Sequence, residues 1–214
     1  MHRLFQRSIF TVGLTGGIAS GKSSIASDLK ALGAFAVDAD KLGHEAYRRG
    51  SATHAAIVRE FGAGVVDAQS GEIDRGKLGQ IVFGDAARMR ALTDIVWPAI
   101  GVLLRQSLDG AERSGAAIAV VEAAVLLEAG WQTHVDEVWV AWVPREVAVQ
   151  RVMQRNGVSR ASAEARLAAQ WSNEQRLRFA AVEINTDRPR ADTQELVRMH
   201  YLALQRRAKQ RSDK

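Results

Sequence analysis

The sequence predicts an α/β fold in which a mostly parallel sheet is flanked by helices. Apolar, β-branched segments of strand length recur along the chain with helical patterns between them, which is typical of repeated βαβ units. A glycine-rich segment also separates the first strand from the first helix. The expected strands are 9–15, 34–38, 117–122, 137–143 and, more weakly, 181–184.

The glycine-rich segment Gly16 to Ser23 reads GGIASGKS, which fills the phosphate-binding pattern GxxxxGK(S/T) without a mismatch. The run from Lys22 to Leu32 predicts an amphipathic helix that ends at Gly33. Glycines let the backbone turn its N–H groups toward phosphates, and the positive end of the helix dipole adds to the attraction. Lys22 is then expected along the β and γ phosphates, and the Ser23 hydroxyl on Mg²⁺. The pattern therefore predicts a nucleoside triphosphate and Mg²⁺ as ligands.

The composition indicates one soluble domain with excursions. The chain has 214 residues, of which 47% are hydrophobic and only three are proline. It has no cysteine, which excludes disulfides and thiolate chemistry and is compatible with a reducing cytoplasm. No apolar run approaches the roughly 20 residues of a transmembrane helix. We therefore expect a cytoplasmic protein with no membrane partner.

Positive charge is concentrated in the last third of the chain. Residues 144–214 carry 15 basic and 8 acidic side chains, within a net charge of +5 for the whole chain. These are mostly arginines spaced along expected helices, with little aromatic interleaving, so a nucleic-acid partner is not expected. They are better explained as arginines that meet the phosphates of a small ligand.

Two excursions interrupt the predicted core, which covers about 8–40, 115–150 and 180–208 of a single kinase-type domain, 1–214. Residues 41–113 contain no convincing strand and include a long helical pattern from Ala86 to Leu108, which predicts a helical insertion that could form a substrate-binding subdomain. Residues 151–178 are arginine-rich and carry a polar turn at 155–159, which predicts a mobile lid.

The second expected strand ends in two carboxylates, Asp38 and Asp40. At this spacing they lie on the same side of an extended backbone. Ligands gather at the carboxyl ends of parallel strands, so the pair is expected to face the phosphates, where a carboxylate can orient an acceptor hydroxyl and take its proton. The alternative is that Asp40 caps a helix that begins near Lys41.

The third expected strand ends at Glu122 and resembles the second carboxylate motif of phosphate-loop enzymes, although apolar runs that end in Glu are common. Arg151 and Arg155 are four apart and share a face of an expected helix, and Arg166 and Gln170 repeat this spacing. Clustered guanidinium groups can neutralise a transferring phosphoryl group, although exposed helical arginines are ordinary. His44 lies one helical turn after Asp40, and a solvated or packed histidine is the alternative to a functional one.

Taken together, several segments resemble dephospho-coenzyme A kinase, in order and at the family's spacing over roughly residues 10–187. They are GLTGGIASGKSS, VDADKLGHEAY, FGAGVV, GEIDRGKLGQIVF, LTDIVWP, VLLEAGW, and RVMQRNG with RLAAQ. His44, Trp97 with Pro98, and VLLEAGW are more similar to the kinase domain of the animal bifunctional coenzyme A synthase. At Glu122 the usual bacterial stretch contains an aspartate and a proline.

The resemblance implies ATP-dependent phosphorylation of the ribose 3′-hydroxyl of dephospho-coenzyme A, which gives coenzyme A and ADP. It implies Asp40 as the catalytic base, with Lys22, Arg151 and Arg155 as further catalytic residues, and Ser23 as the metal ligand. Nucleotide-binding residues implied are Gly17, Ile18, Ala19, Ser20, Gly21, Lys22, Ser23 and Ser24. Acceptor-binding residues implied are Asp38, Asp40, His44, Asp74, Arg75, Leu78 and Glu128.

Three alternatives stay open at this point. A kinase of another small hydroxyl compound or of a nucleoside monophosphate would share the loop and the lid. A regulatory nucleotide-binding module would hydrolyse or sense nucleotide without transfer, although the Asn-Lys-x-Asp segment of guanine-binding proteins is missing. A nucleic-acid binder ranks last. The expected assembly is a monomer or a weak homo-oligomer.

Overall fold

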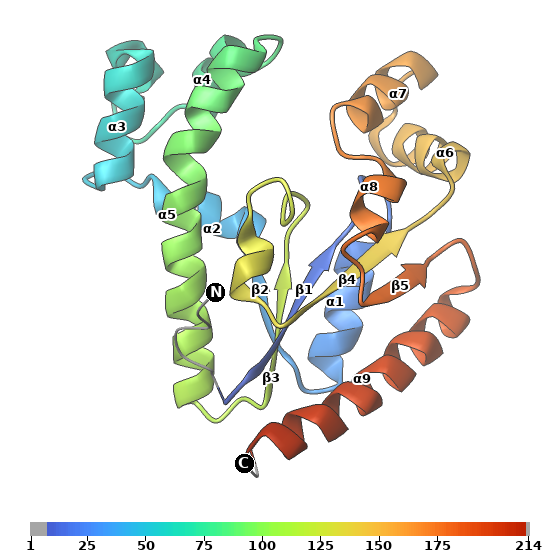
Figure 1. Cartoon of the computed structure of the whole chain (residues 1–214). Coiled ribbons are helices and arrows are strands. Elements are labelled where there is room, and N and C mark those ends of the chain that lie inside the picture. Colours follow the sequence, from blue (N-terminus) through green and yellow to red (C-terminus); the bar gives the residue numbers. More distant parts are fainter. Residues whose placement is uncertain (1–7, 213–214) are drawn as a thin grey trace. The chain divides into compact units, whose positions relative to one another are not determined.

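The computed structural model describes residues 8–212 and contains a five-stranded parallel sheet (Figure 1). This confirms the predicted fold class. The strand order is β2-β3-β1-β4-β5, so β1 lies at the centre and the connection from β3 to β4 crosses over it. The strands are β1 (Phe10–Thr15), β2 (Phe35–Asp38), β3 (Ile118–Glu122), β4 (Glu137–Trp142) and β5 (Val182–Asn185).

Burial follows the position of each strand in the sheet. All six residues of the central strand β1 are buried, as expected for a parallel strand that is covered on both faces. The edge strand β5 buries only Ile184 fully and carries the polar residues Glu183 and Asn185. An edge position therefore explains why the sequence pattern of β5 is weak.

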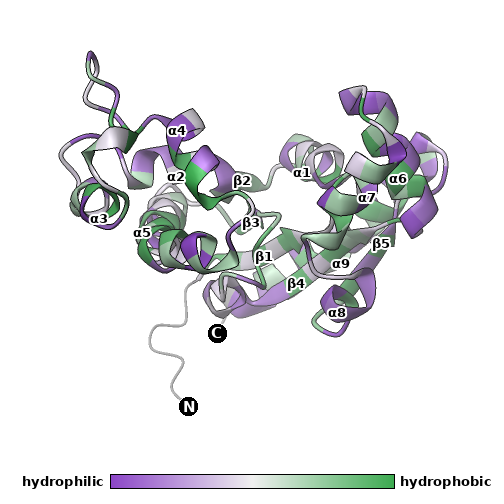
Figure 2. Ribbon diagram, turned by 90° about the horizontal axis from the view of Figure 1, so that it is seen from above, coloured by the Kyte–Doolittle hydropathy of each residue, from purple (hydrophilic) through white to green (hydrophobic). Residues whose placement is uncertain are grey.

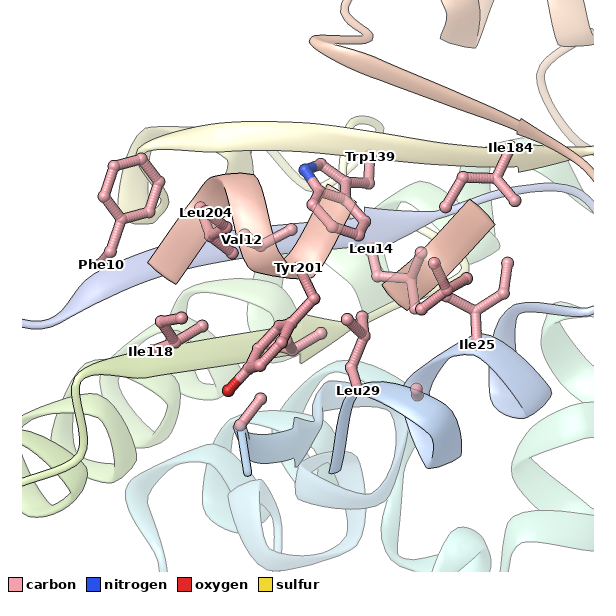
Figure 3. Close-up of a cluster of buried hydrophobic side chains, with 14 of the residues drawn as sticks. Phe10, Val12, Leu14, Ile25, Leu29, Ile118, Trp139, Ile184, Tyr201 and Leu204 are labelled. Atoms are coloured by element: carbon pink, nitrogen blue, oxygen red, sulfur yellow. The ribbon is translucent and has the colours of Figure 1, made fainter. Parts of the chain in front are cut away.

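The contacts divide the described chain into two compact units, and the first comprises residues 8–38 and 108–212. In this unit α1 and α9 pack together and cover one face of the sheet (Figure 1). Their apolar side chains interlock with those of the strands, and Trp139 is completely buried among them (Figure 3). The helices of this unit are α1 (Lys22–Ala31), η2 (Trp131–His134), α6 (Arg145–Asn156), α7 (Arg160–Ala168), α8 (Asn173–Leu177) and α9 (Arg190–Ser212).

Helices α6 and α7 form a small subassembly with its own apolar core. Val149, Val152 and Ala163 are buried between the two helices, and Ile18 and Ala19 of the glycine loop pack against them. Figure 2 shows that both helices carry hydrophobic and hydrophilic residues on different sides. The segment predicted as a lid is thus joined to the glycine loop by apolar contacts.

The second unit, residues 39–107, is helical. Its elements are α2 (Ala39–Ala46), α3 (Ala52–Phe61), η1 (Ala63–Val65), α4 (Arg75–Val82) and most of α5 (Ala86–Arg113). Within it the described chain forms only one isolated bridge, between Val66 and Ile73, and no strand. Helix α5 begins where the pattern predicted but continues five residues beyond Leu108. Among residues 8–212 no helix is long and apolar enough to cross a bilayer.

A partly buried ion pair joins the C-terminal helix to the start of the sheet. The carboxylate of Asp136 accepts two hydrogen bonds from Arg211, both 2.9 Å, and two from the amide and hydroxyl of Thr11, both 2.8 Å. Burial by itself would raise the pKa of Asp136, but the hydrogen bonds from Arg211 and Thr11 outweigh it and hold the pKa below its ordinary value of 3.8.

We expect Asp136→Asn to lower the free energy of unfolding at pH 7 by about 2 kcal/mol, because the amide cannot replace charge-assisted hydrogen bonds to Arg211. A lowered folded pKa stabilises the fold above the unfolded pKa and loses this effect as the pH falls through the folded pKa. The deficit of the variant should therefore shrink below about pH 4. Urea unfolding of parent and variant at several pH values measures this, with the exposed Asp187→Asn as control; a deficit that does not depend on pH would contradict it.

Candidate functional site

The phosphate-binding loop connects β1 to α1 as its pattern predicted. The chain leaves β1 after Thr15, and α1 begins at Lys22. Gly16 lies so close to β4 that a Cβ atom there would be 2.2 Å from the carbonyl oxygen of Ala141. Gly21 has a φ of 83°, in the left-handed region that favours glycine. Packing and backbone conformation therefore require these two glycines.

Arg151 of α6 braces the middle of this loop. Its Nη1 donates to the carbonyl of Ala19 at 3.3 Å and to Oγ1 of Thr186 at 3.0 Å, and its Nη2 donates to the carbonyl of Thr186 at 2.8 Å. The hydroxyl of Thr186 in turn donates to the carbonyl of Ser20 at 2.9 Å. Ala19 has a φ of 62°, the one positive φ of a non-glycine residue in the described part of the chain. Arg151 and Thr186 thus hold the loop in a conformation that alanine adopts only at some cost.

The structure separates the two arginines that the helical spacing had paired. Arg155 is exposed, and its Nε donates to the side chain of the adjacent Asn156 at 3.3 Å. Both arginines belong to α6, as predicted, and Arg151 is the one that donates a hydrogen bond to the loop, at Ala19. Gln170, which was expected on a helix with Arg166, lies just beyond the end of α7. The catalytic roles of Arg151 and Arg155 stay predictions.

A hydroxyl and a carboxylate meet at the carboxyl end of the sheet. Oγ of Ser23, in the first turn of α1, donates to Oε1 of Glu122 at 2.7 Å. Glu122 ends β3, in register with Leu14 of β1 on one side and Asp38 of β2 on the other. The predicted strand that ends in an acid is thus present and brings Glu122 to Ser23, although Glu122 was not among the predicted site residues.

This pair fits a magnesium ion by its donor chemistry. Mg²⁺ prefers hard oxygen ligands and is usually bound through one or two protein groups, with substrate phosphates and water completing the shell. Ser23 and Glu122 supply such oxygens beside the loop. Within residues 8–212 no group of three or more His, Cys, Asp or Glu side chains forms a larger metal cluster.

A pocket of about 420 Å³ opens beside the first residues of the loop. Its walls include Gly17, Ile18, Gln170 and Arg176. The side-chain carbonyl of Gln170 accepts a hydrogen bond of 2.8 Å from the amide of Ile18, so the end of the lid segment contacts the loop directly. The predicted nucleotide-binding residues Gly17, Ile18, Ala19, Ser20, Gly21, Lys22, Ser23 and Ser24 all lie in the loop or the first turn of α1.

Glu128, predicted to bind the acceptor, forms an ion pair with a residue that the sequence did not single out. Oε1 of Glu128 lies 3.0 Å from Nη2 of Arg176 on α8, whose side chain is only 1% exposed. A second nitrogen of this guanidinium, Nη1, donates to the carbonyl of Trp171. The local sequence around Arg176 is an ordinary polar helix, so no sequence pattern distinguishes this arginine from its exposed neighbours.

The two aspartates at the end of β2 do not share one extended segment, which corrects the prediction. Asp38 is the last residue of β2, whereas α2 begins at Ala39 and includes Asp40 in its first turn. The alternative is also wrong in detail, because a helix that begins at Ala39 leaves Asp40 inside it rather than at its N-cap. Strand β2 is only four residues long, and helix α2 begins at the next residue.

The other predicted acceptor residues belong to the second unit. His44, on α2 with Asp40, is exposed and meets the ring of Tyr47 edge to face at 6.3 Å. Asp74 is the N-cap of α4 and accepts from the amides of Gly76 and Lys77, at 2.9 and 3.1 Å. On the same helix Arg75 is exposed, whereas Leu78 is 5% exposed. Asp74 therefore has a capping role whether or not it contacts a substrate.

Comparison with known proteins covers almost the whole chain. The sequence model of the family described as dephospho-CoA kinase matches residues 10–192. A dephospho-CoA kinase of Geobacter sulfurreducens is 47% identical over 82% of this chain and 89% of its own length. One of Moorella thermoacetica is 40% identical over 92% and 93%.

Solved structures agree with this similarity. The protein TT1252 of Thermus thermophilus superimposes with a TM-score of 0.77 at 31% identity, over 91% of this chain and 97% of its own. The dephospho-CoA kinase of Campylobacter jejuni gives a TM-score of 0.70 at 25% identity, over 92% and 97%. By sequence and by fold, the chain belongs to the dephospho-CoA kinase family.

Proposed function

We propose that this protein transfers the γ-phosphoryl group of ATP to the ribose 3′-hydroxyl of dephospho-coenzyme A, which gives coenzyme A and ADP in the final step of coenzyme A biosynthesis. The observation that carries the proposal is membership of the dephospho-CoA kinase family over residues 10–192. The phosphate loop, with Ser23 and Glu122 joined beside it, is the local geometry that supports it.

In the proposed reaction the 3′-oxygen forms a bond to the γ-phosphorus while the bond from that phosphorus to the β,γ-bridging oxygen breaks. The bond electrons go to the β-phosphate of ADP, and the hydroxyl proton goes to the carboxylate of Asp40. The loop amides and Lys22 bind the phosphates, and Arg151 keeps the loop in shape. Arg155 is proposed to neutralise charge on the transferring group.

Mg²⁺ is proposed as the cofactor, with Ser23 and Glu122 to hold it. When bound, it neutralises charge on the β and γ phosphate oxygens. The contribution of the chain is to fix the hydroxyl and the carboxylate 2.7 Å apart at the end of β3, which brings two hard ligands to one place.

We expect Glu122→Gln to raise the Mg²⁺ concentration needed for half-maximal activity about 10- to 100-fold, because an amide lacks the charge that attracts the cation. Glutamine has nearly the same shape, so the fold should be kept. A titration of activity with MgCl₂ measures the shift. Glu183→Gln on β5 is the matched control, and an Mg²⁺ dependence equal to that of the parent would contradict the assignment.

The helical unit of residues 39–107 is proposed to bind the coenzyme A portion of the acceptor. Asp38, Asp40, His44, Arg75 and Leu78 are the residues that the family resemblance assigns to this role, with Asp74 and Glu128. The exposure of His44 and Arg75 supports contact with a ligand, whereas burial of Leu78 supports a role in shaping the unit. Residues 151–178 are proposed as a lid that closes on ATP.

We further propose that the protein works in the cytoplasm, where ATP is available, as a monomer or a weak homo-oligomer, with these two small molecules as its partners.

The test is ADP release by the purified protein with ATP and Mg²⁺, with and without dephospho-coenzyme A, together with the product mass. We expect ADP release that depends on the acceptor, and a gain of one phosphate on dephospho-coenzyme A. An acceptor that lacks the 3′-hydroxyl should give no product. ADP release that no acceptor changes would overturn the proposal.

A further inference from the structure

The buried Arg176 is unusual among the charged residues of this protein. Within residues 8–212 it is the one charged residue that is buried, with 1% of its side chain exposed. Burial lowers the pKa of this guanidinium and Glu128 opposes that effect, and arginine remains protonated at any pH at which the protein works. Burying a positive charge costs free energy because the charge loses its hydration, so the position of Arg176 needs a physical explanation.

The pair of Arg176 and Glu128 does not use its full hydrogen-bonding capacity. Nε of Arg176 and Oε2 of Glu128 are both buried and have no hydrogen-bond partner in the part of the chain that the structure describes. The hydroxyl of Ser20, another wall residue of the pocket, is in the same condition. Unsatisfied buried groups are rare in folded proteins, and here they gather beside a pocket.

The guanidinium lies against the opening residues of the phosphate loop. A Cβ atom built on Gly17 would be 3.6 Å from Nη1 of Arg176 and 3.8 Å from Oε1 of Gln170. Gly17, Ile18 and Arg176 line the same pocket of about 420 Å³. A positive charge from α8 therefore lies beside Gly17, whereas Arg151 and Thr186 contact the loop at Ala19 and Ser20.

The arginines of this region differ in how many of their N–H groups are already used in hydrogen bonds within the protein. Arg151 already donates three hydrogen bonds to loop and strand-end oxygens, and Arg155 is exposed. Arg176 is fixed by Glu128 and by the carbonyl of Trp171, borders the pocket, and keeps one nitrogen unused. A guanidinium that is held in this way binds a phosphate at little cost in side-chain entropy.

We propose that Arg176 binds the γ-phosphate of ATP and that Glu128 is the positioning residue that holds it. The loop amides and the start of α1 would bind the α and β phosphates, and Ser23 and Glu122 would hold a metal ion that neutralises phosphate charge. Glu128 lies in the connection after β3 and holds Arg176 through a contact of 3.0 Å. The effect on turnover rests on the proposed function, whereas the effect on ATP binding does not.

The binding experiment compares ATP with ADP in the absence of any acceptor. Isothermal titration of parent, Arg176→Lys and Arg176→Met should show ATP affinity about tenfold weaker for the methionine variant, while ADP affinity changes less than about twofold. Lysine should give an intermediate loss, because it keeps the charge without the planar fork. The matched control is Arg178→Met, two residues further on and exposed. Thermal unfolding of each variant verifies the fold.

A structural role would weaken ATP and ADP equally or leave both unchanged, and either result would overturn the proposal. If the methionine variant does not fold, the lysine variant and Glu128→Gln decide by the same ratio of ATP to ADP affinity. With dephospho-coenzyme A present, kcat should fall about 10²-fold or more for Arg176→Met. A parent that binds ATP but does not phosphorylate this acceptor would refute the proposed function, and the ATP to ADP ratio would still decide the role of Arg176.

Discussion

Replacing Asp40 with asparagine is expected to lower kcat about 10²- to 10⁴-fold while ATP affinity stays nearly unchanged. The amide has the shape of the carboxylate but cannot accept a proton from the 3′-hydroxyl. Asp40 is exposed in the first turn of α2 and follows the end of β2 by two residues. Steady-state turnover with dephospho-coenzyme A and calorimetric binding of ATP measure the two effects separately.

Asp94→Asn is a matched control for this prediction, since Asp94 is an exposed carboxylate of the same helical unit. It should leave kcat within about twofold of the parent. Near-normal turnover of Asp40→Asn would show that another group takes the proton, and Asp38 would be the next residue to replace. The pH dependence of kcat would then identify the titrating carboxylate.

Lys22→Ala is expected to reduce both turnover and nucleotide binding, with kcat lowered about 10³-fold and ATP affinity about tenfold. Lys22 begins α1 at the end of the phosphate loop, and the loop pattern predicts that its ammonium group binds the β and γ phosphates. Because charge on these oxygens grows as the phosphoryl group leaves, the loss in kcat should exceed the loss in binding. The same two assays as for Asp40 measure it.

Lys30→Ala serves as the control for Lys22, because it removes an exposed lysine from the last turn of the same helix. Its kcat and ATP affinity should match those of the parent. A Lys22→Ala protein with normal ATP affinity would mean that the loop amides alone determine nucleotide binding. The contrast with Asp40→Asn, which should affect kcat alone, distinguishes a phosphate-binding group from a base.

The sequence alone was sufficient for the features that depend on neighbouring residues. The apolar run before Gly16 predicted β1, the pattern from Gly16 to Ser23 predicted the loop, and the helical period after Lys22 predicted α1. The parallel sheet also followed, because strands that alternate with helices have few other ways to bury their apolar faces. The spacing of Asp38 and Asp40 gave a wrong prediction for Asp40, because this residue belongs to helix α2, which begins at Ala39, and not to an extended strand.

Only the tertiary structure decided which distant side chains meet. Ser23 and Glu122 are 99 positions apart, and they join because β3 pairs directly with β1 in a strand order that no local pattern encodes. Arg151 and Arg155 have the same chemistry and the same helix, and their surroundings alone give one to the loop and the other to solvent. Arg176 of α8 is buried where it contacts Glu128 in the segment after β3. The position of its charge is therefore fixed only when the chain folds. Sequence periodicity reports which face of an element is buried, whereas the partners across that face depend on the packing of the whole domain.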